Sequence, residues 1–154
     1  MSIAIGDKVP DLKLPASGGR ELSLRDYKGR KLVVYFYPRD NTPGCTLEGQ
    51  EFTAQYKQFT KAGADIVGVS RDSVKSHDNF SAKFGFPYAL LSDRDGELCE
   101  AFGAIVEKSM YGRKYMGIDR CTFLFDAAGV LRREWRKVSA KGHAAAVLEA
   151  VQQL

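Results

Sequence analysis

An apolar strand that ends in a proline-containing loop, followed at once by a helix, constrains this chain more than any other feature. Residues Leu32–Tyr37 form an unbroken apolar run rich in β-branched and aromatic side chains, which is typical of a strand buried on both faces. Pro38 ends the run, and the segment Asp40–Gly44 has the composition of a loop. A helical pattern of apolar residues then begins at Cys45. The sequence therefore predicts a cysteine in the first turn of a helix, directly after a central strand.

The first turn of a helix favours the ionised form of a thiol. Backbone N–H groups lack intrahelical partners there, and the helix dipole has its positive end at the same place. A free thiol has a pKa of about 8.5, so its reactivity at neutral pH depends on such stabilisation of the anion. We therefore expect Cys45 to be a reactive thiolate, although most cysteines are small buried hydrophobes.

Length and composition indicate one globular domain over residues 1–154. Apolar residues make up 44% of the chain and charged residues 27%, which are ordinary values for such a domain. No apolar run approaches the roughly 20 residues of a transmembrane helix. The first residues also lack the apolar segment of a secretory signal. We expect a cytoplasmic protein that does not contact membranes.

Charge and cysteine content exclude several other classes. The net charge of +4 is modest, and we expect the basic cluster Arg132–Lys137 to be a solvated strand face rather than a nucleic-acid site. The three cysteines, an odd number without a C-x-x-C pair, argue against a disulfide framework, a zinc site and a thioredoxin-type dithiol. No cofactor or metal is expected.

Apolar patterns along the chain alternate between strands and helices after an extended N-terminal segment. Strands are predicted at residues 21–24, 31–37, 65–70, 88–91, 122–125 and 130–136, and helices at 45–61, 73–83, 139–154 and directly after Ser92, which would form a capping box with Asp95. This order predicts an α/β fold with a mixed central sheet flanked by helices and an N-terminal extension. A thioredoxin-like fold is compatible with it, as are other α/β folds. We expect residues 104–118 to be an irregular surface loop, and His77 and His143 to face solvent.

The segment Tyr37–Glu48, with its Thr42-Pro43-Gly44-Cys45, resembles the active-site loop of the peroxiredoxins, most closely that of the bacterioferritin comigratory protein (Q-type) subfamily. The resemblance continues through Val67–Ser70, Leu90–Asp93 and Arg120–Leu124, and it covers nearly the whole chain. It implies a thioredoxin-like fold. It also implies a thiol-dependent peroxidase that reduces hydrogen peroxide and organic hydroperoxides through a cysteine sulfenic acid.

The chemistry of the matching residues agrees with this implication. The hydroxyl of Thr42 can donate and accept hydrogen bonds, so it can orient a peroxide. Arg120 stays charged and can stabilise both the Cys45 thiolate and the departing oxygen. The family assigns these roles to its threonine and arginine, a shielding role to the proline at Pro38, and orientation of the arginine to the glutamate at Glu48. Local roles are open as well: Thr42 as a helix cap and Glu48 as an acid near the helix start.

The chain departs from the family pattern at the resolving cysteine. Many Q-type members carry it five residues after the reactive cysteine, where this chain has Gln50, and others carry it near the position of Ser81. Strand alternation places Cys121 on the face opposite Arg120, and Cys99 could act only if a helix opened. We expect a one-cysteine mechanism with thioredoxin, glutaredoxin or a low-molecular-weight thiol as the external reductant. A monomer is expected because the subfamily is often monomeric.

A redox sensor that changes partners when Cys45 is oxidised would use the same residues. The sequence separates this alternative poorly from the enzyme.

Overall fold

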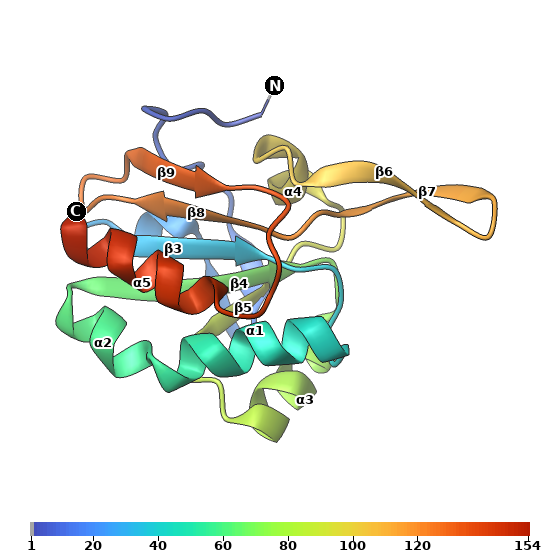
Figure 1. The fold of residues 1–154 in the computed structure, drawn as a ribbon, viewed down its shortest axis with the longest axis horizontal. Helices are drawn as coiled ribbons and strands as arrows, with labels where there is room; N and C mark the ends of the chain where they lie inside the picture. Colours follow the sequence, from blue (N-terminus) through green and yellow to red (C-terminus); the bar gives the residue numbers. More distant parts are fainter. Residues whose placement is uncertain (1) are drawn as a thin grey trace.

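The computed structural model describes residues 2–154 (Figure 1). Its strands are β1 (Leu14–Ala16), β2 (Arg20–Leu22), β3 (Lys31–Phe36), β4 (Ala64–Ser70), β5 (Ala89–Ser92), β6 (Ile105–Met110), β7 (Arg113–Ile118), β8 (Cys121–Phe125) and β9 (Leu131–Trp135). Its helices are the 3₁₀ helix η1 (Leu24–Tyr27), α1 (Pro43–Ala54), α2 (Tyr56–Lys61), α3 (Val74–Phe84), α4 (Glu97–Ala101) and α5 (His143–Gln153). None of these helices is long and apolar enough to cross a membrane.

Seven strands form a mixed sheet in the order β2-β1-β5-β4-β3-β8-β9. Strands β3, β4 and β5 run parallel, and β8 joins β3 in the antiparallel direction. The strand β3 is therefore central, and all of its residues after Lys31 are buried. A strand covered by packing on both faces needs a continuous apolar sequence, which is what Leu32–Phe36 supplies.

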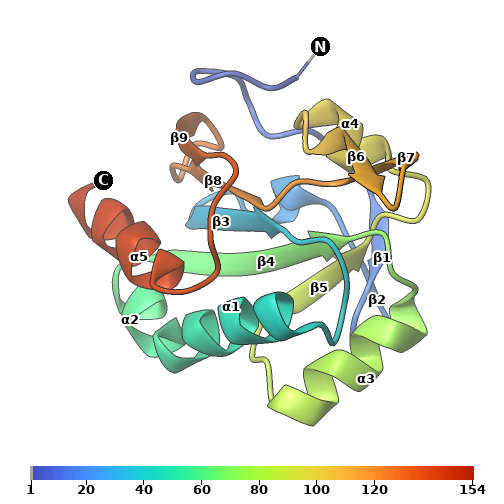
Figure 2. The same cartoon turned by 45° about the vertical axis from the view of Figure 1, so that its right-hand side comes forward.

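Helices cover both faces of the sheet, as Figure 2 shows. One core cluster packs side chains of α1, α2, α3 and α5 against one face, and includes Tyr35, Cys45 and Leu124. The other cluster packs η1 and α4 against the opposite face, and includes Phe36, Cys121 and Phe123. Alternate residues of β3 and β8 thus point into different cores. The predicted mixed α/β architecture is confirmed.

Residues 104–118 are a hairpin, so the prediction of an irregular loop was wrong. Strands β6 and β7 pair antiparallel from Ile105↔Ile118 to Met110↔Arg113 and project away from the main sheet (Figure 1). The turn consists of Tyr111 at φ 52° and Gly112 at φ 76°, as a two-residue turn with left-handed backbone at both positions requires. Most side chains of the hairpin are exposed, so its sequence lacks the apolar alternation that marks a half-buried strand.

Three helix boundaries also differ from the sequence prediction. The helix expected over 45–61 is interrupted at Gln55, which separates α1 from α2. Ser92 belongs to β5 instead of capping α4; the Asp93 carboxylate accepts the N–H groups of Leu98 and Cys99 at 3.1 and 2.8 Å, so Asp93 satisfies that helix start. The last helix begins at residue 143 rather than 139.

His77 and His143 are buried, which corrects the expectation that they face solvent. His143 Nε2 lies 2.8 Å from the hydroxyl oxygen of Thr122. Burial lowers the pKa of His143 to about 4, and the nearby positive charge of Arg120 acts in the same direction. His143 is therefore a neutral core residue at physiological pH.

The basic cluster at residues 132–137 lies on and just after the edge strand β9. Arg132 pairs with Asp126 at 3.2 Å, and the Arg133 guanidinium lies over the Trp135 ring. Arg136 donates to the backbone carbonyls of residues 102 and 103. These contacts agree with a strand face whose charges are largely satisfied within the protein.

Candidate active site

Cys45 lies in the first turn of α1, which follows the C-terminal end of the central strand β3. Thr42 is the N-cap residue, and the N–H of Thr46 donates to Thr42 O at 2.8 Å as the first bond of the helix. The N–H groups of Gly44 and Cys45 precede that bond, so they are available to an anion or an oxygen atom. The cysteine itself is only 2% exposed. A sulfur in this position is shielded from bulk water but next to the positive end of a helix.

Arg120 lies just before β8, whose first residue Cys121 pairs with Phe36 at the end of β3, so Arg120 and Cys45 are at the same end of the sheet. Its Nη2 donates to Cys45 Sγ at 3.3 Å, and its backbone oxygen accepts the Val138 N–H at 3.1 Å. A Cβ atom at Gly44 would lie 3.1 Å from that same Nη2. The glycine therefore leaves room for the guanidinium to approach the helix start.

Glu48 holds the other side of the guanidinium. It follows Cys45 by three residues, so both side chains lie on one face of α1, and Arg120 Nη1 donates to Glu48 Oε1 at 2.6 Å. Burial raises the pKa of Glu48 to about 7, although the charge of Arg120 opposes this. Burial also acts to lower the pKa of Arg120, but the charges of Glu48 and Cys45 outweigh it and raise that pKa. Arg120 thus remains a cation between two groups that can carry negative charge.

Thr42 is half-buried, and its hydroxyl does not cap α1. The Oγ1 atom instead donates to Arg39 O at 2.8 Å, so the expected side-chain cap is not formed. This bond fixes the hydroxyl group in the loop and leaves its oxygen free to accept a hydrogen bond.

Pro38 is exposed and lies directly after β3, in the wall of a pocket beside the loop. Shielding of the sulfur by this proline stays a prediction.

Cys99 and Cys121 are buried in the core cluster on the opposite face of the sheet from Cys45. Burial raises the pKa of Cys121 to about 12, and burial, with the nearby Asp93, raises the pKa of Cys99 even further. Both are therefore neutral thiols in the folded protein. The orientation predicted for Cys121 from strand alternation is confirmed.

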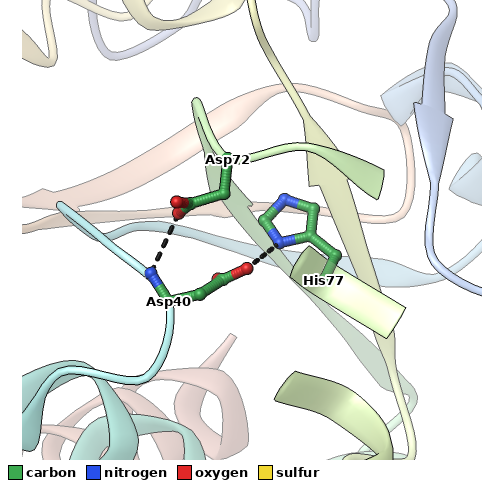
Figure 3. A group of neighbouring side chains, drawn as sticks. All are labelled: Asp40, Asp72 and His77. Atoms are coloured by element: carbon green, nitrogen blue, oxygen red, sulfur yellow. Dashed lines mark hydrogen bonds and ion pairs between the residues drawn. The ribbon is translucent and has the colours of Figure 1, made fainter. Parts of the chain in front are cut away.

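Beneath the loop that carries the candidate site lies a buried polar cluster that the sequence did not predict (Figure 3). His77 Nε2 lies 2.9 Å from Leu91 O, and Nδ1 lies 2.7 Å from Asp40 Oδ2. Because a carbonyl oxygen can only accept, Nε2 carries a hydrogen, and a further proton lies between Nδ1 and the carboxyl group. The Tyr37 hydroxyl donates to Asp40 Oδ1 at 2.6 Å.

The Asp72 side chain is connected to this cluster through the backbone N–H of Asp40. Its Oδ2 accepts the Asp40 N–H at 2.9 Å and the Ser70 hydroxyl at 2.6 Å. Asp40, Asp72 and His77 have side chains of the kind that bind metals, and their ligand atoms lie within 4.8 Å of one another. Their close atoms are, however, engaged in hydrogen bonds to one another and to neighbouring groups. We interpret the cluster as a clamp that attaches the loop after β3 to β4, α3 and β5.

A thiol beside a helix start, with a guanidinium in contact, on a sheet of this topology is the arrangement of a thiol-based redox protein. The profile of the AhpC/TSA family matches residues 5–134. The chain belongs to this family, and within it to the peroxiredoxins of the Bcp, or Q, type.

Its relatives match over almost their whole length. Peroxiredoxin Bcp of Xanthomonas campestris is 57% identical over 92% of this chain and 88% of its own, and peroxiredoxin Bcp of Bacillus subtilis is 45% identical over 100% and 98%. A solved structure of a PrxQ mutant from Xylella fastidiosa is 44% identical and superimposes with a TM-score of 0.94 over 99% of this chain and 98% of its own. The thioredoxin-like fold expected from the resemblance is confirmed.

One further solved structure concerns the alkyl peroxide reduction activity of the bacterioferritin comigratory protein of Xanthomonas campestris. It is 52% identical, with a TM-score of 0.89, over 96% of this chain and 98% of its own.

Proposed function

We propose that this protein is a thiol-dependent peroxidase that reduces hydrogen peroxide and organic hydroperoxides, with Cys45 as the nucleophile. The observation that carries the proposal is the contact of 3.3 Å between Arg120 Nη2 and Cys45 Sγ at the start of α1. A guanidinium and a helix N-terminus both favour the thiolate, which is the nucleophilic form.

The reaction follows from the groups around the sulfur. The Cys45 thiolate attacks one oxygen of the peroxide, an S–O bond forms, and the O–O bond breaks. The departing oxygen leaves as hydroxide or alkoxide and takes up a proton, which leaves Cys45 as a sulfenic acid. Arg120 and the N–H groups at the helix start stabilise the negative charge that moves to the departing oxygen. The Thr42 oxygen accepts a hydrogen bond from the O–H of the peroxide in this proposal.

The sulfenic acid must then be reduced by a second thiol, and we propose that this thiol comes from another molecule. Gln50 and Ser81 occupy the two positions where Q-type relatives carry a resolving cysteine. Cys99 and Cys121 lie in the other core cluster and are protonated. A disulfide needs Cα atoms within about 7 Å of each other, so either pairing with Cys45 would require a rearrangement of the core.

Several finer expectations remain predictions. Thioredoxin, glutaredoxin and a low-molecular-weight thiol are the candidate reductants. The monomeric state, the single domain, the cytoplasmic location and the absence of nucleic-acid binding also stay as predicted from the sequence.

Peroxide consumption by single-cysteine variants tests the function. With excess dithiothreitol, the wild type, Cys99→Ser and Cys121→Ser should consume hydrogen peroxide over many turnovers, while Cys45→Ser should not. Circular dichroism and thermal unfolding should show that Cys45→Ser is folded. Sustained consumption by folded Cys45→Ser, or a wild type that stops after one equivalent, would contradict a peroxidase that acts through this residue.

A further inference from the structure

A basic pocket of about 420 Å³ opens beside the candidate site, between the end of β3 and the β6–β7 hairpin. Four of the residues that line it carry a positive charge, Arg39, Arg71, Arg94 and Lys108, and none that lines it is acidic. The exposed side chains of Tyr115 and Met116 supply an apolar wall. A pocket with these walls is suited to an anionic ligand with a short carbon skeleton.

The positive charges of this pocket have no carboxylate partner in the part of the chain that the structure describes. No salt bridge within 4.0 Å involves any of the four, whereas other arginines such as Arg30, Arg120 and Arg132 each have one. Two of the acids next to Arg71 and Arg94 in sequence are occupied elsewhere: Asp72 accepts from Asp40 N–H and Ser70, and Asp93 accepts from the start of α4. The third, Asp95, is exposed and does not line the pocket. Like charges gathered in one concave place create a positive potential that a bound anion relieves.

Chain continuity links the wall of this pocket to the candidate site through two segments. Pro38, in its wall, precedes the N-cap residue Thr42 by four positions. Ile118, also in its wall, precedes Arg120 by two positions, and two residues of extended chain span about 7 Å at most. The ammonium group of Lys108 donates to the backbone oxygen of Ile118, which fixes one of the cations at this side. A ligand in the pocket therefore lies against the segments that lead to Thr42 and to Arg120.

We propose that this pocket binds the carboxylates of a small thiol reductant that carries at least two of them, and so directs its sulfur to oxidised Cys45. The inference rests on the proposed function, because it concerns the second half of that reaction. The second half-reaction requires an external thiol if no cysteine of this chain resolves Cys45, whereas a peroxide needs no charged group to react. The pocket therefore serves the reductant.

The chemistry of the step is a thiol exchange in two parts. The reductant sulfur attacks the sulfur of the Cys45 sulfenic acid, an S–S bond forms, the S–O bond breaks, and the oxygen leaves as water with the protons of the two groups. A second molecule of the thiol then attacks the reductant sulfur of this mixed disulfide. Cys45 leaves as the thiolate, and the two reductant molecules are oxidised to their disulfide.

The test is the reduction rate of preformed Cys45 sulfenic acid by thiols of different charge. Mercaptosuccinate carries two carboxylates, 2-mercaptoethanol is neutral and cysteamine is cationic. In the double variant Arg71→Gln with Arg94→Gln, the rate constant for mercaptosuccinate should fall about tenfold, as expected for two partly exposed charge contacts, while that for 2-mercaptoethanol stays within about twofold. Added salt should weaken the wild-type preference for mercaptosuccinate, since it screens the charges.

Charge reversal and a matched control sharpen the test. The variant Arg71→Glu with Arg94→Glu should favour cysteamine over mercaptosuccinate, which inverts the wild-type order. The control Arg132→Gln with Arg133→Gln removes the same charge from the edge strand β9 and should leave the preference unchanged. Thermal unfolding shows whether each variant is folded. If a variant with a substitution at Arg71 does not fold, the double variant Arg39→Gln with Arg94→Gln is used in its place.

Two results would overturn the inference. One is an equal preference among the three thiols in the wild type and the pocket variants. The other is a loss confined to oxidation by a carboxylate-bearing hydroperoxide, with thiol rates unchanged, which would assign the pocket to the oxidant. Oxidation of Cys45 by hydrogen peroxide is measured in the same samples. If that oxidation does not occur, the proposed function fails; if it is normal in every variant, only the assignment of the pocket is at stake.

Discussion

Arg120 Nη1 lies 2.6 Å from Oε1 of Glu48, a carboxylate that is fully buried beneath the candidate site. The other carboxylate oxygen, Oε2, has no hydrogen-bond partner among the described residues. A buried carboxylate with one satisfied oxygen holds its negative charge at a cost, and this cost appears as the raised pKa of Glu48.

The raised pKa makes the stability of the protein depend on pH. Because the pKa of Glu48 is about 7 in the folded state and near 4.5 in the unfolded chain, the folded state binds the proton more tightly. The stabilisation that comes from this proton on Glu48 is fully present below pH 4.5 and is lost as the pH rises through about 7. Relative to Glu48→Gln, which does not ionise, the wild type should lose about 3 kcal/mol of unfolding free energy over this range. Chemical denaturation of both proteins at the two ends of the range measures this loss. If the difference in unfolding free energy between the wild type and Glu48→Gln did not change with pH, the prediction would be wrong.

Removal of the guanidinium should slow the oxidation of Cys45. In Arg120→Ala, the second-order rate constant for reaction with hydrogen peroxide should fall about 100- to 1000-fold, on the scale of the loss of one oxyanion donor. Arg120→Lys should recover part of this rate, because an ammonium keeps the charge but cannot form the same two-sided contact with Cys45 and Glu48. Stopped-flow measurement in a single turnover tests both; a rate in Arg120→Ala equal to that of the wild type would exclude a role for the contact.

The Thr42 hydroxyl should be needed for the same step. Thr42→Val keeps the shape of the side chain but removes the hydroxyl group, so the oxidation rate should fall by at least about tenfold. Thr42→Ser retains the group and serves as the matched control. Similar rates in the two variants would show that the threonine has only its structural role at the helix start.

The Asp40–His77 pair should stabilise the fold. His77→Leu leaves the buried Asp40 carboxyl group without one of its partners, so it should lower the unfolding free energy by about 3 kcal/mol. The double variant with Asp40→Asn should lose less than the sum of the two single variants, since the residues contact each other. Urea denaturation of the four proteins measures this coupling, and strictly additive losses would argue against the clamp.

Oxidation by peroxide without added thiol should form no disulfide within the chain. Wild type and Cys99→Ser should then give the same pattern of masses, apart from the substitution itself. Mass spectrometry under non-reducing conditions makes the comparison. A Cys45–Cys99 disulfide in the wild type would replace the one-cysteine mechanism with an intramolecular one.

Local pattern was sufficient for the strand, loop and helix around Cys45. The apolar run Leu32–Tyr37, the proline after it and the helical spacing beyond lie within one short segment, so the sequence predicts them directly. The contact between Arg120 and Cys45 spans 75 positions, and only the family resemblance pointed to it. Exposed on most of its surface, the β6–β7 hairpin carries no apolar periodicity to reveal it.

Buried polar groups were the other failure of sequence reasoning. His77 lies in a polar stretch of sequence, which is typical of a solvated helix face. Its partners, Asp40 and the backbone oxygen of Leu91, are 37 and 14 positions away. Polar burial depends on such distant partners, so local composition does not report it.

Trapping of the sulfenic acid tests the central claim most directly. The reduced protein is treated with one equivalent of hydrogen peroxide in the presence of dimedone, which labels sulfenic acids, and the labelled residue is identified by peptide mass spectrometry. We expect the label on Cys45 alone, and none on this residue in the Arg120→Ala protein at the same short time. A label on Cys99 or Cys121, or a Cys45 that stays reduced in the wild type, would contradict the account.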